Sequence, residues 1–270
     1  MTSPFYKTAL DRTSAALAEI AVRAGAAIME VYRSDFVAQW KADDTPVTLA
    51  DRRAEAVILP ALAALLPGVP LVSEESFDAS QPAPPAGGSF LLVDPLDGTR
   101  EFIKRNGEST VNIALVDGDR PVAGCVHAPA LGELYFAATQ AFVSLQDATA
   151  PFDAAAARPI AVRAVPAQGA IALVSRSHRD PHTERFLAGV AGVRHESIGS
   201  SLKFCRIAAG RADLYPRFGP TMEWDVAAGH AVLQAAGGSV TTPDGAPFRY
   251  GKFAAGLRNG PFIARGRRER

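Results

Sequence analysis

Two carboxylates that follow an apolar run are the residues of this chain whose types and spacing most directly suggest chemistry. Residues 91–99 read Leu-Leu-Val-Asp-Pro-Leu-Asp-Gly-Thr, so Asp94 and Asp97 stand at the carboxyl end of a predicted strand. Mg²⁺ prefers hard oxygen ligands and usually takes a few carboxylates, which leaves coordination positions for water and a substrate phosphate. The pair therefore predicts a magnesium site, although Asp-x-x-Asp-Gly-Thr alone also fits an ordinary acidic turn or a calcium loop.

The loop around these carboxylates can supply two further contacts. Pro95 fixes the backbone between them and can turn the carbonyl of Leu96 toward the same cation. The backbone amides of Gly98 and Thr99 can face an anion where a helix starts. One short loop would then hold both a metal and a phosphate.

Other acids stand at the ends of predicted elements elsewhere in the chain. Glu74 and Glu75 follow an apolar run, and Asp225 stands at the start of a predicted helix, where the dipole favours an anion. Asp51, also at a helix start, can accept a hydrogen bond from a hydroxyl group. A surface loop or helix capping explains each acid singly, so the prediction depends on their coincidence.

The elements that must position these acids follow from periodicity and turn residues. Apolar spacing predicts helices at 8–33 and 48–66, the second with a bend at Pro60. Strands are predicted at 71–73, 90–93, 110–116, 122–127 and 133–138, the last three as an antiparallel meander. Further strands are predicted at 170–174, at 213–215 and near Val240 and Phe262, with helices at 183–190, 200–209 and 224–236.

Composition limits the class of protein. With 270 residues and 48% hydrophobic content, the chain can bury one large core or two lobes, and we place a boundary between residues 155 and 156. Lys and Arg total 28, as do Asp and Glu, so no strong field favours nucleic acid as a partner. We expect a cytoplasmic protein without an export signal or integral membrane segment, and leave peripheral contact with the inner membrane open.

Four motifs in order carry a family resemblance. They are Lys-x-Asp-x-Thr-Pro-Val-Thr-x-Ala-Asp ending at Asp51, Ser-Glu-Glu-Ser at 73–76, Asp-Pro-Leu-Asp-Gly-Thr at 94–99 and Trp-Asp-Val-Ala-Ala-Gly at 224–229. Together they resemble the inositol monophosphatase superfamily over nearly the whole chain. Residues 98–108, 199–205 and 212–225 are most similar to the CysQ-type 3′(2′),5′-bisphosphate nucleotidases.

The resemblance implies a fold and a set of site residues. The fold would be an α/β (α+β layered) sandwich, with an N-terminal α+β lobe (1–155), a C-terminal α/β lobe (156–270) and the site between them. Activity would require two or three Mg²⁺ ions and would be sensitive to lithium. The implied metal ligands are Glu74, Asp94, the Leu96 carbonyl, Asp97 and Asp225, and the implied catalytic residues are Asp51, Thr99 and Glu74.

A cluster of polar residues suggests the substrate. Ser200 and Lys203 are three apart on a predicted helix and can point at one anionic group, and Arg217 adds a second cation. By resemblance, His178, next to Ser177, would border a nucleotide, although a solvated loop also explains this segment. With Gly98 and Thr99 at the scissile phosphate, these groups favour a small nucleotide with two phosphates, such as 3′-phosphoadenosine 5′-phosphate.

The resulting hypothesis is a phosphatase that releases AMP and phosphate from this substrate. One metal ion would lower the pKa of water, Thr99 would relay a proton toward Asp51, and another ion would stabilise the leaving oxygen. The alternatives are a phosphatase for inositol phosphate or another sugar phosphate, and an inactive nucleotide sensor, against which the Asp51 and Thr99 pair argues. We expect a monomer or a homodimer.

Overall fold

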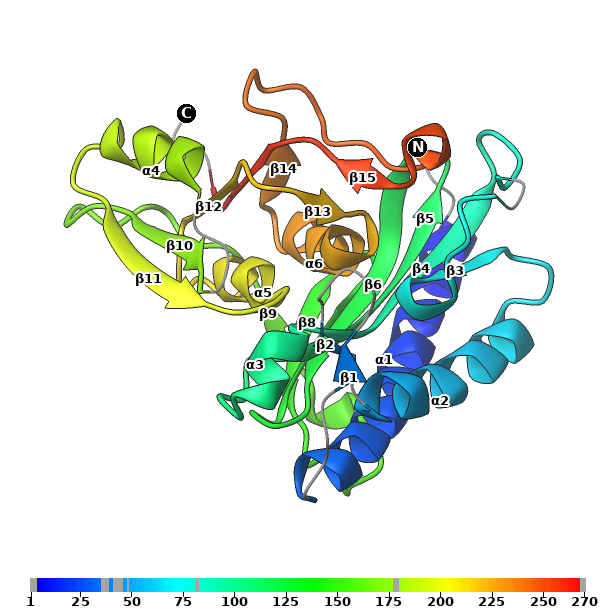
Figure 1. Ribbon diagram of the computed structural model, residues 1–270. Helices are drawn as coiled ribbons and strands as arrows, with labels where there is room; N and C mark the ends of the chain where they lie inside the picture. The colour runs from blue at the N-terminus through cyan, green and yellow to red at the C-terminus, as the bar shows by residue number, and fades with distance from the viewer. Residues whose placement is uncertain are drawn as a thin grey trace.

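Two β-sheets, with helices between and beside them, form the layers of the fold in this computed structural model (Figure 1). The structure describes residues 4–34, 39–40, 46–47, 49–80, 83–176 and 180–267. The larger sheet follows chain order, with its first two strands parallel and all later neighbours antiparallel. Its strands are β3 (Leu71–Ser73), β4 (Ser89–Asp97), β5 (Thr110–Asp117), β6 (Arg120–Ala128), β7 (Glu133–Ala137), β8 (Ala141–Leu145) and β9 (Arg158–Ile160).

The smaller sheet is mixed and has the order β11-β10-β12-β16-β14. β10 pairs in parallel with β11 and β12, whereas β16 is antiparallel to both of its neighbours. These strands are β10 (Ile171–Ser175), β11 (Arg194–Ile198), β12 (Leu214–Arg217), β14 (Ser239–Thr241) and β16 (Phe262–Arg265). Two short pairs join β1 (Gln39–Trp40) to β2 (Pro46–Val47), and β13 (Thr221–Met222) to β15 (Arg258–Asn259).

Alternation along β4 explains how helices cover both faces of the larger sheet. Successive side chains of a strand point to opposite faces. Leu91 and Val93 belong to the core formed with α1 (Pro4–Tyr32) and α2 (Leu49–Leu65). Phe90 and Leu92 belong to the opposite core, which includes residues of α5 (Leu202–Ala208) and α6 (Trp224–Ala235).

The smaller sheet divides its residues in the same way. Leu173 of β10 packs in the core shared with α5 and α6, whereas its neighbour Ala172 packs with Leu187 of α4 (Pro181–Ala188). The layers are therefore helix, sheet, helix, sheet and helix. This arrangement confirms the predicted layered α/β fold. The short helix α3 (Thr99–Ile103) follows the end of β4 (Figure 1).

Most predicted elements are present, and two differences matter for the site. β4 does not end at residue 93 but continues through Asp94 to Asp97. The helix predicted from residue 200 begins only at Leu202, because Ser200 has a φ of 48°, in the left-handed region. α2 continues through Pro60, which lies on its exposed face, and the bend predicted there stays a prediction.

The division into two lobes at 155/156 also stays a prediction, and β9 beyond that point still pairs with β8. Among the described helices, none combines the length and the apolar content that a bilayer span requires.

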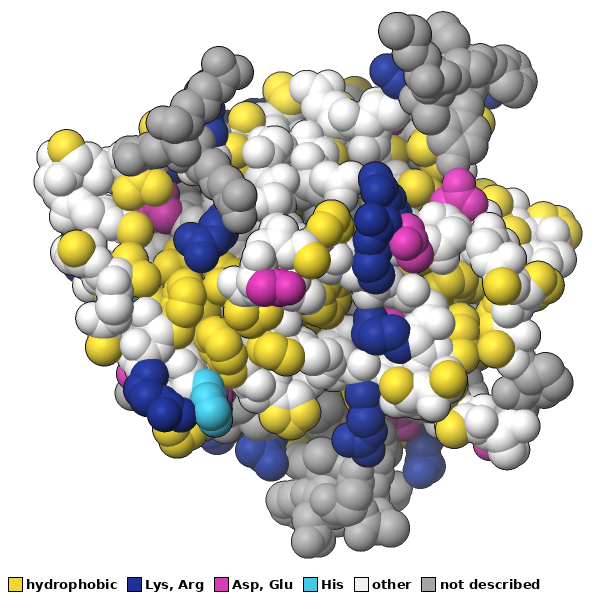
Figure 2. Space-filling view, turned by 90° about the horizontal axis from the view of Figure 1, so that it is seen from above, with side chains coloured by type: hydrophobic (Ala, Val, Ile, Leu, Met, Phe, Trp, Pro, Cys, Tyr) yellow, Lys and Arg dark blue, Asp and Glu magenta, His cyan; other side chains and the backbone are white. Residues whose placement is uncertain are grey.

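On the face in Figure 2, a row of Lys and Arg side chains lies directly beside Asp and Glu. Both signs of charge thus meet on this face, in keeping with the equal totals in the sequence.

Candidate active site

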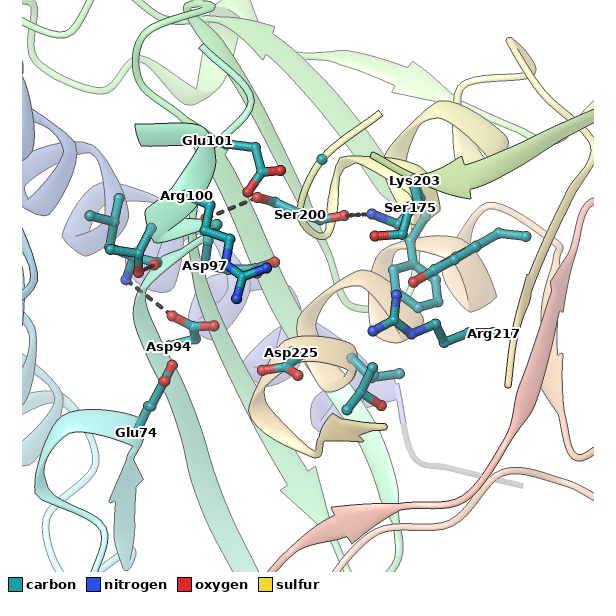
Figure 3. Close-up of a pocket in the computed structure, with 18 of the residues that line it drawn as sticks. Glu74, Asp94, Asp97, Arg100, Glu101, Ser175, Ser200, Lys203, Arg217 and Asp225 are labelled. Carbon is teal, nitrogen blue, oxygen red and sulfur yellow. Dashed lines mark hydrogen bonds between the residues drawn. The ribbon is translucent and has the colours of Figure 1, made fainter. Parts of the chain in front are cut away.

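Glu74 and Asp94 lie close together because their strands pair in parallel. Ser73 stands opposite Val93 in the register of β3 and β4. Glu74 and Asp94, the residues that directly follow this pair, are therefore neighbours. Asp225 joins them from the first turn of α6. A carboxylate oxygen from each of the three lies within 4.8 Å of the other two, and Figure 3 shows the three side chains meeting at one end of a pocket.

Burial and mutual repulsion make this cluster electrostatically unfavourable by itself. Burial, followed by the negative charges of Glu74, Asp97, Asp225 and Asp51, holds the pKa of Asp94 well above its ordinary value. Burial also raises the pKa of Asp225, with Asp97 and Glu74 adding to the effect. Such a cluster gains stability from a proton or a cation.

The donor set fits a hard divalent cation. Carboxylate oxygens are the ligands that Mg²⁺ prefers, and few of them are needed because water and substrate complete its coordination. The spacing within 4.8 Å is close to the span across an octahedral site, for which metal-to-oxygen distances are about 2.0–2.1 Å. Glu74, Asp94 and Asp225 could therefore hold one such ion.

Asp97 is placed next to this cluster by an irregularity in β4. Asp94 pairs with Asn112 and Asp97 pairs with Thr110, with a register shift between them that accommodates Pro95. The backbone amide of Ser201 donates a 2.7 Å hydrogen bond to Asp97, and the side-chain amide of Asn112 approaches the same oxygen at 3.4 Å. Burial raises the pKa of Asp97, while the nearby Lys203 ammonium opposes this shift.

Leu96 and Thr99 occupy the turn that follows the first carboxylate. The amide of Leu96 donates to Asp94 at 3.1 Å, which closes the turn across Pro95. The hydroxyl of Thr99 donates a long, 3.5 Å hydrogen bond to the carbonyl oxygen of Leu96. Gly98 between them has a φ of 85°, a conformation that glycine adopts without strain.

Asp51 is buried in the first turn of α2. It does not line the pocket, but its charge contributes to the raised pKa of Asp94 and so acts from nearby. The predicted pairing of Asp51 with Thr99 stays a prediction.

Two buried cations lie at the other end of the pocket. The ammonium of Lys203 donates to the carbonyl oxygens of Ser200 at 2.6 Å and Ile198 at 3.2 Å, and lies 5.1 Å from the centre of the Tyr215 ring. Burial lowers the pKa of Lys203 to about 8. The Arg217 guanidinium donates to the carbonyl oxygens of two residues that follow it, Gly219 at 3.3 Å and Pro220 at 3.0 Å.

Ser200 does not share a helix with Lys203, contrary to the sequence prediction. Its hydroxyl donates a 2.9 Å hydrogen bond to the backbone carbonyl of Asp97, as Figure 3 shows. The i, i+3 geometry therefore does not hold. The reason is local, because the left-handed backbone at Ser200 delays the start of α5.

A single cavity of about 320 Å³ joins these groups, a size suited to a small metabolite. The predicted residues that line it are Glu74, Asp94, Leu96, Asp97, Gly98, Thr99, Ser200, Lys203, Arg217 and Asp225. Glu74, Asp94 and Asp225 gather at one end, where Arg100 also lies, and Lys203 and Arg217 lie at the other (Figure 3). Ser177 and His178 lie outside the described residues.

Sequence reasoning missed other polar residues at the site. Arg100 and Glu101 line the cavity from α3. Their position directly after the acidic motif could have identified them as candidate site residues. Asn112 and Ser201 were missed because a polar residue in a strand or before a helix has no distinctive pattern. Only the packing of β5 against the loop before α5 brings both to Asp97.

The inositol monophosphatase family model matches residues 9–265 of this chain. The chain belongs to the inositol monophosphatase family. Members of this family are metal-dependent phosphatases, and the carboxylates of Glu74, Asp94 and Asp225 form a ligand set of the matching kind.

Relatives of this inositol monophosphatase family member include bacterial proteins. The 3′(2′),5′-bisphosphate nucleotidase CysQ of Escherichia coli K12 is 44% identical over 243 residues, which cover 86% of this chain and 91% of the relative. The protein of the same name from Salmonella typhimurium LT2 is 45% identical over 230 residues, covering 82% and 87%.

Solved structures agree with this family assignment. The crystal structure of CysQ from Bacteroides thetaiotaomicron matches with a TM-score of 0.81 and 38% identity, covering 96% of this chain and 98% of that one. An inositol monophosphatase from Thermotoga maritima matches with a TM-score of 0.71 over 92% and 89% of the two chains, and at 24% identity it supports the fold alone.

Proposed function

We propose that this family member is a magnesium-dependent hydrolase that removes one phosphate from a 3′(2′),5′-bisphosphate nucleotide, such as 3′-phosphoadenosine 5′-phosphate. The products are AMP and phosphate. The observation that carries the proposal is the separation of charge within one cavity, between the acids at one end and Lys203 and Arg217 at the other. The similarity to the CysQ 3′(2′),5′-bisphosphate nucleotidases supports the same substrate class.

The two ends of the cavity suit the two phosphates of such a substrate. The acids can hold the cations that bind the scissile phosphate, whereas a buried ammonium and guanidinium suit a second phosphate. An ammonium has three donors, and two carbonyl oxygens accept from that of Lys203 among the described residues. The remaining donor is available for a substrate anion.

In this proposal, Glu74, Asp94, the Leu96 carbonyl, Asp97 and Asp225 hold two or three Mg²⁺ ions. Bound Mg²⁺ supplies two things: it lowers the pKa of the attacking water, and it offsets the charge on the phosphate and the leaving oxygen.

The residues of the chain then orient the reactants and move one proton. The hydroxyl of Thr99 accepts a proton from the water while it passes its own to the carboxylate of Asp51. The water oxygen forms a bond to phosphorus in line with the ester bond that breaks. The leaving 3′ (or 2′) oxygen takes up a proton from solvent water and departs as the nucleoside hydroxyl, the protonated Asp51 returns its proton to solvent, and Lys203 and Arg217 retain the second phosphate.

A comparison of substrates tests the proposal. We expect kcat/KM for 3′-phosphoadenosine 5′-phosphate to exceed that for inositol 1-phosphate by at least about 100-fold, because the monophosphate has no second phosphate to bind Lys203 and Arg217. A chelator should abolish both activities, and Mg²⁺ should restore them.

Two variants test the two ends of the cavity independently. Arg217→Ala should lower the ratio of kcat/KM for the bisphosphate to kcat/KM for inositol 1-phosphate. Asp94→Asn should reduce kcat/KM for both substrates by a similar factor. Equal or faster hydrolysis of inositol 1-phosphate by the wild type would instead support the sugar-phosphate alternative. Tight binding of the nucleotide without release of phosphate would support the sensor. Cytoplasmic localisation and the monomeric or homodimeric state stay predictions.

A further inference from the structure

Glu108 connects the segment before β5 to two parts of the smaller sheet. Its carboxylate accepts hydrogen bonds from Nε and Nη2 of Arg176 at 2.7 and 2.6 Å, and from the backbone amide of Gly199 at 2.7 Å. Arg176 directly follows β10 and also donates to the carbonyl oxygen of Ser197 in β11, at 2.7 Å. One carboxylate thus fixes the ends of two neighbouring parallel strands.

A side chain at position 199 would force a neighbouring glutamate to shift. A Cβ atom on Gly199 would lie 2.7 Å from Cγ of Glu101 and 3.0 Å from Cβ of Glu108. The two glutamates therefore pack directly against the backbone of this loop. The position of the loop at Gly199 relative to the larger sheet therefore depends on Glu101 and Glu108.

The loop continues into two residues that bind candidate metal ligands. The hydroxyl of Ser200 donates to the carbonyl oxygen of Asp97 at 2.9 Å, and the amide of Ser201 donates to the Asp97 carboxylate at 2.7 Å. The hydroxyl of Ser201 donates to the backbone carbonyl of Asp225 at 2.6 Å. The loop at 199–201 is therefore a direct bridge between a ligand on β4 and a ligand on α6.

The backbone of this bridge needs support from outside. Ser200 has a φ of 48°, in the left-handed region, which is strained for a non-glycine residue. A bidentate arginine and carboxylate pair is among the stronger and more directional polar contacts in proteins. The Glu108 side chain is only 14% exposed, so water competes weakly for it.

We propose that Glu108 is a positioning residue for the candidate metal site. By holding Arg176 and the amide of Gly199, it fixes the 199–201 loop and so sets Asp97 and Asp225 at the separation that the cations require. Glu108 is not among the residues that line the cavity, so it acts through the loop. The inference rests on the proposed function in taking Asp97 and Asp225 as metal ligands.

The chain offers a matched control at the opposite end of β5. Asp119 binds Nη1 of Arg249 at 2.8 and 2.9 Å and also joins the larger sheet to a later segment. Neither residue lines the cavity. Because both side chains are about half exposed, loss of this pair should change stability only slightly and should leave the metal site unchanged.

The test compares Glu108→Ala, Glu108→Gln and Asp119→Ala by two measurements. One is the rise in Tm as Mg²⁺ alone is added, and the other is the Mg²⁺ concentration that gives half-maximal phosphate release. We expect Glu108→Ala to raise the half-saturating Mg²⁺ by about tenfold or more in both, the usual range for residues that orient metal ligands. Glu108→Gln should fall between it and the wild type, because its amide oxygen still accepts from Gly199.

We expect Asp119→Ala to keep the wild-type response to Mg²⁺ whatever its Tm. A Glu108→Ala protein that is less stable but has a wild-type response in both measurements would overturn the positioning role. If that variant does not fold, Arg176→Lys is compared with Arg249→Lys, and an equal Mg²⁺ response in these two variants would overturn the proposal as well. A wild type whose Tm responds to Mg²⁺ but that releases no phosphate would overturn the proposed function alone.

Discussion

The backbone amide of Ser201 donates a 2.7 Å hydrogen bond to the carboxylate of Asp97, although 104 residues separate them in sequence. The same serine donates its hydroxyl to the carbonyl oxygen of Asp225 and accepts from the Asn112 amide at 3.1 Å. A single small residue thus contacts two of the candidate metal ligands, Asp97 and Asp225. Its backbone amide binds Asp97, and its side-chain hydroxyl binds Asp225.

Replacing Ser201 with Ala should weaken metal binding without removing any ligand. The variant keeps the amide bond to Asp97 but leaves the buried Asn112 amide without its Ser201 partner, which should cost about 1–3 kcal/mol of unfolding free energy. We expect the half-saturating Mg²⁺ to rise by about tenfold. Denaturant unfolding and a Mg²⁺ titration of Tm measure the two effects, and an unchanged Mg²⁺ response would contradict the link to the ligands.

Asp94→Asn should lower activity while making the metal-free protein at least as stable as the wild type. Burial and neighbouring negative charges raise the pKa of Asp94 in the folded protein. Folding is therefore destabilised as the pH rises above the pKa that Asp94 has in the unfolded chain. An amide removes that charge and can still accept from the Leu96 amide, but it is a poor ligand for Mg²⁺.

We expect kcat/KM of this variant to fall by about 100-fold or more, since outer partners of a metal site alone account for 10–100-fold. Thermal unfolding in chelator should give a Tm equal to or above that of the wild type. A clear drop in that Tm would show that the Asp94 charge is stabilised by the protein itself.

The pH dependence of activity should depend on Lys203. Burial lowers its pKa to about 8, the charges of Asp97, Glu101 and Glu108 oppose that shift, and Arg217 adds to it. Because deprotonation removes a cation from the free enzyme, kcat/KM for the bisphosphate should fall as pH rises through about 8. Lys203→Arg, which stays charged, should lose this fall, and identical profiles for the two proteins would exclude Lys203 as its source.

Thr99→Ala should separate catalysis from metal binding. If the hydroxyl relays a proton, its loss should lower kcat by about 100-fold or more. The rise in Tm on adding Mg²⁺ should stay at the wild-type value, because no ligand is removed. Thr99→Ser restores the hydroxyl and should recover most of kcat, and a serine variant as slow as the alanine variant would argue against the relay.

Local patterns were sufficient for the parts of the molecule that depend on neighbours in sequence. The meander at β5, β6 and β7 follows from alternation and turn residues, and α6 follows from its apolar content and the two glycines after it. The acidic motif at 94–99 was also visible, because its residue types and spacing carry the chemistry. The missed β11, β13 and β15 are short or exposed, and each pairs with a strand that another element separates from it in sequence. The missed β8 is a short strand that forms a hairpin with β7.

By itself, the amino-acid sequence determined most of the helices and strands, and it predicted which of their residues could bind a metal and a phosphate. Tertiary structure decided how these residues meet: the parallel register that places Glu74 beside Asp94, the left-handed turn at Ser200 and the contact of Glu108 with Arg176. The physical reason is that periodicity and turn preferences act over a few residues, whereas these contacts arise from packing between segments far apart in the chain.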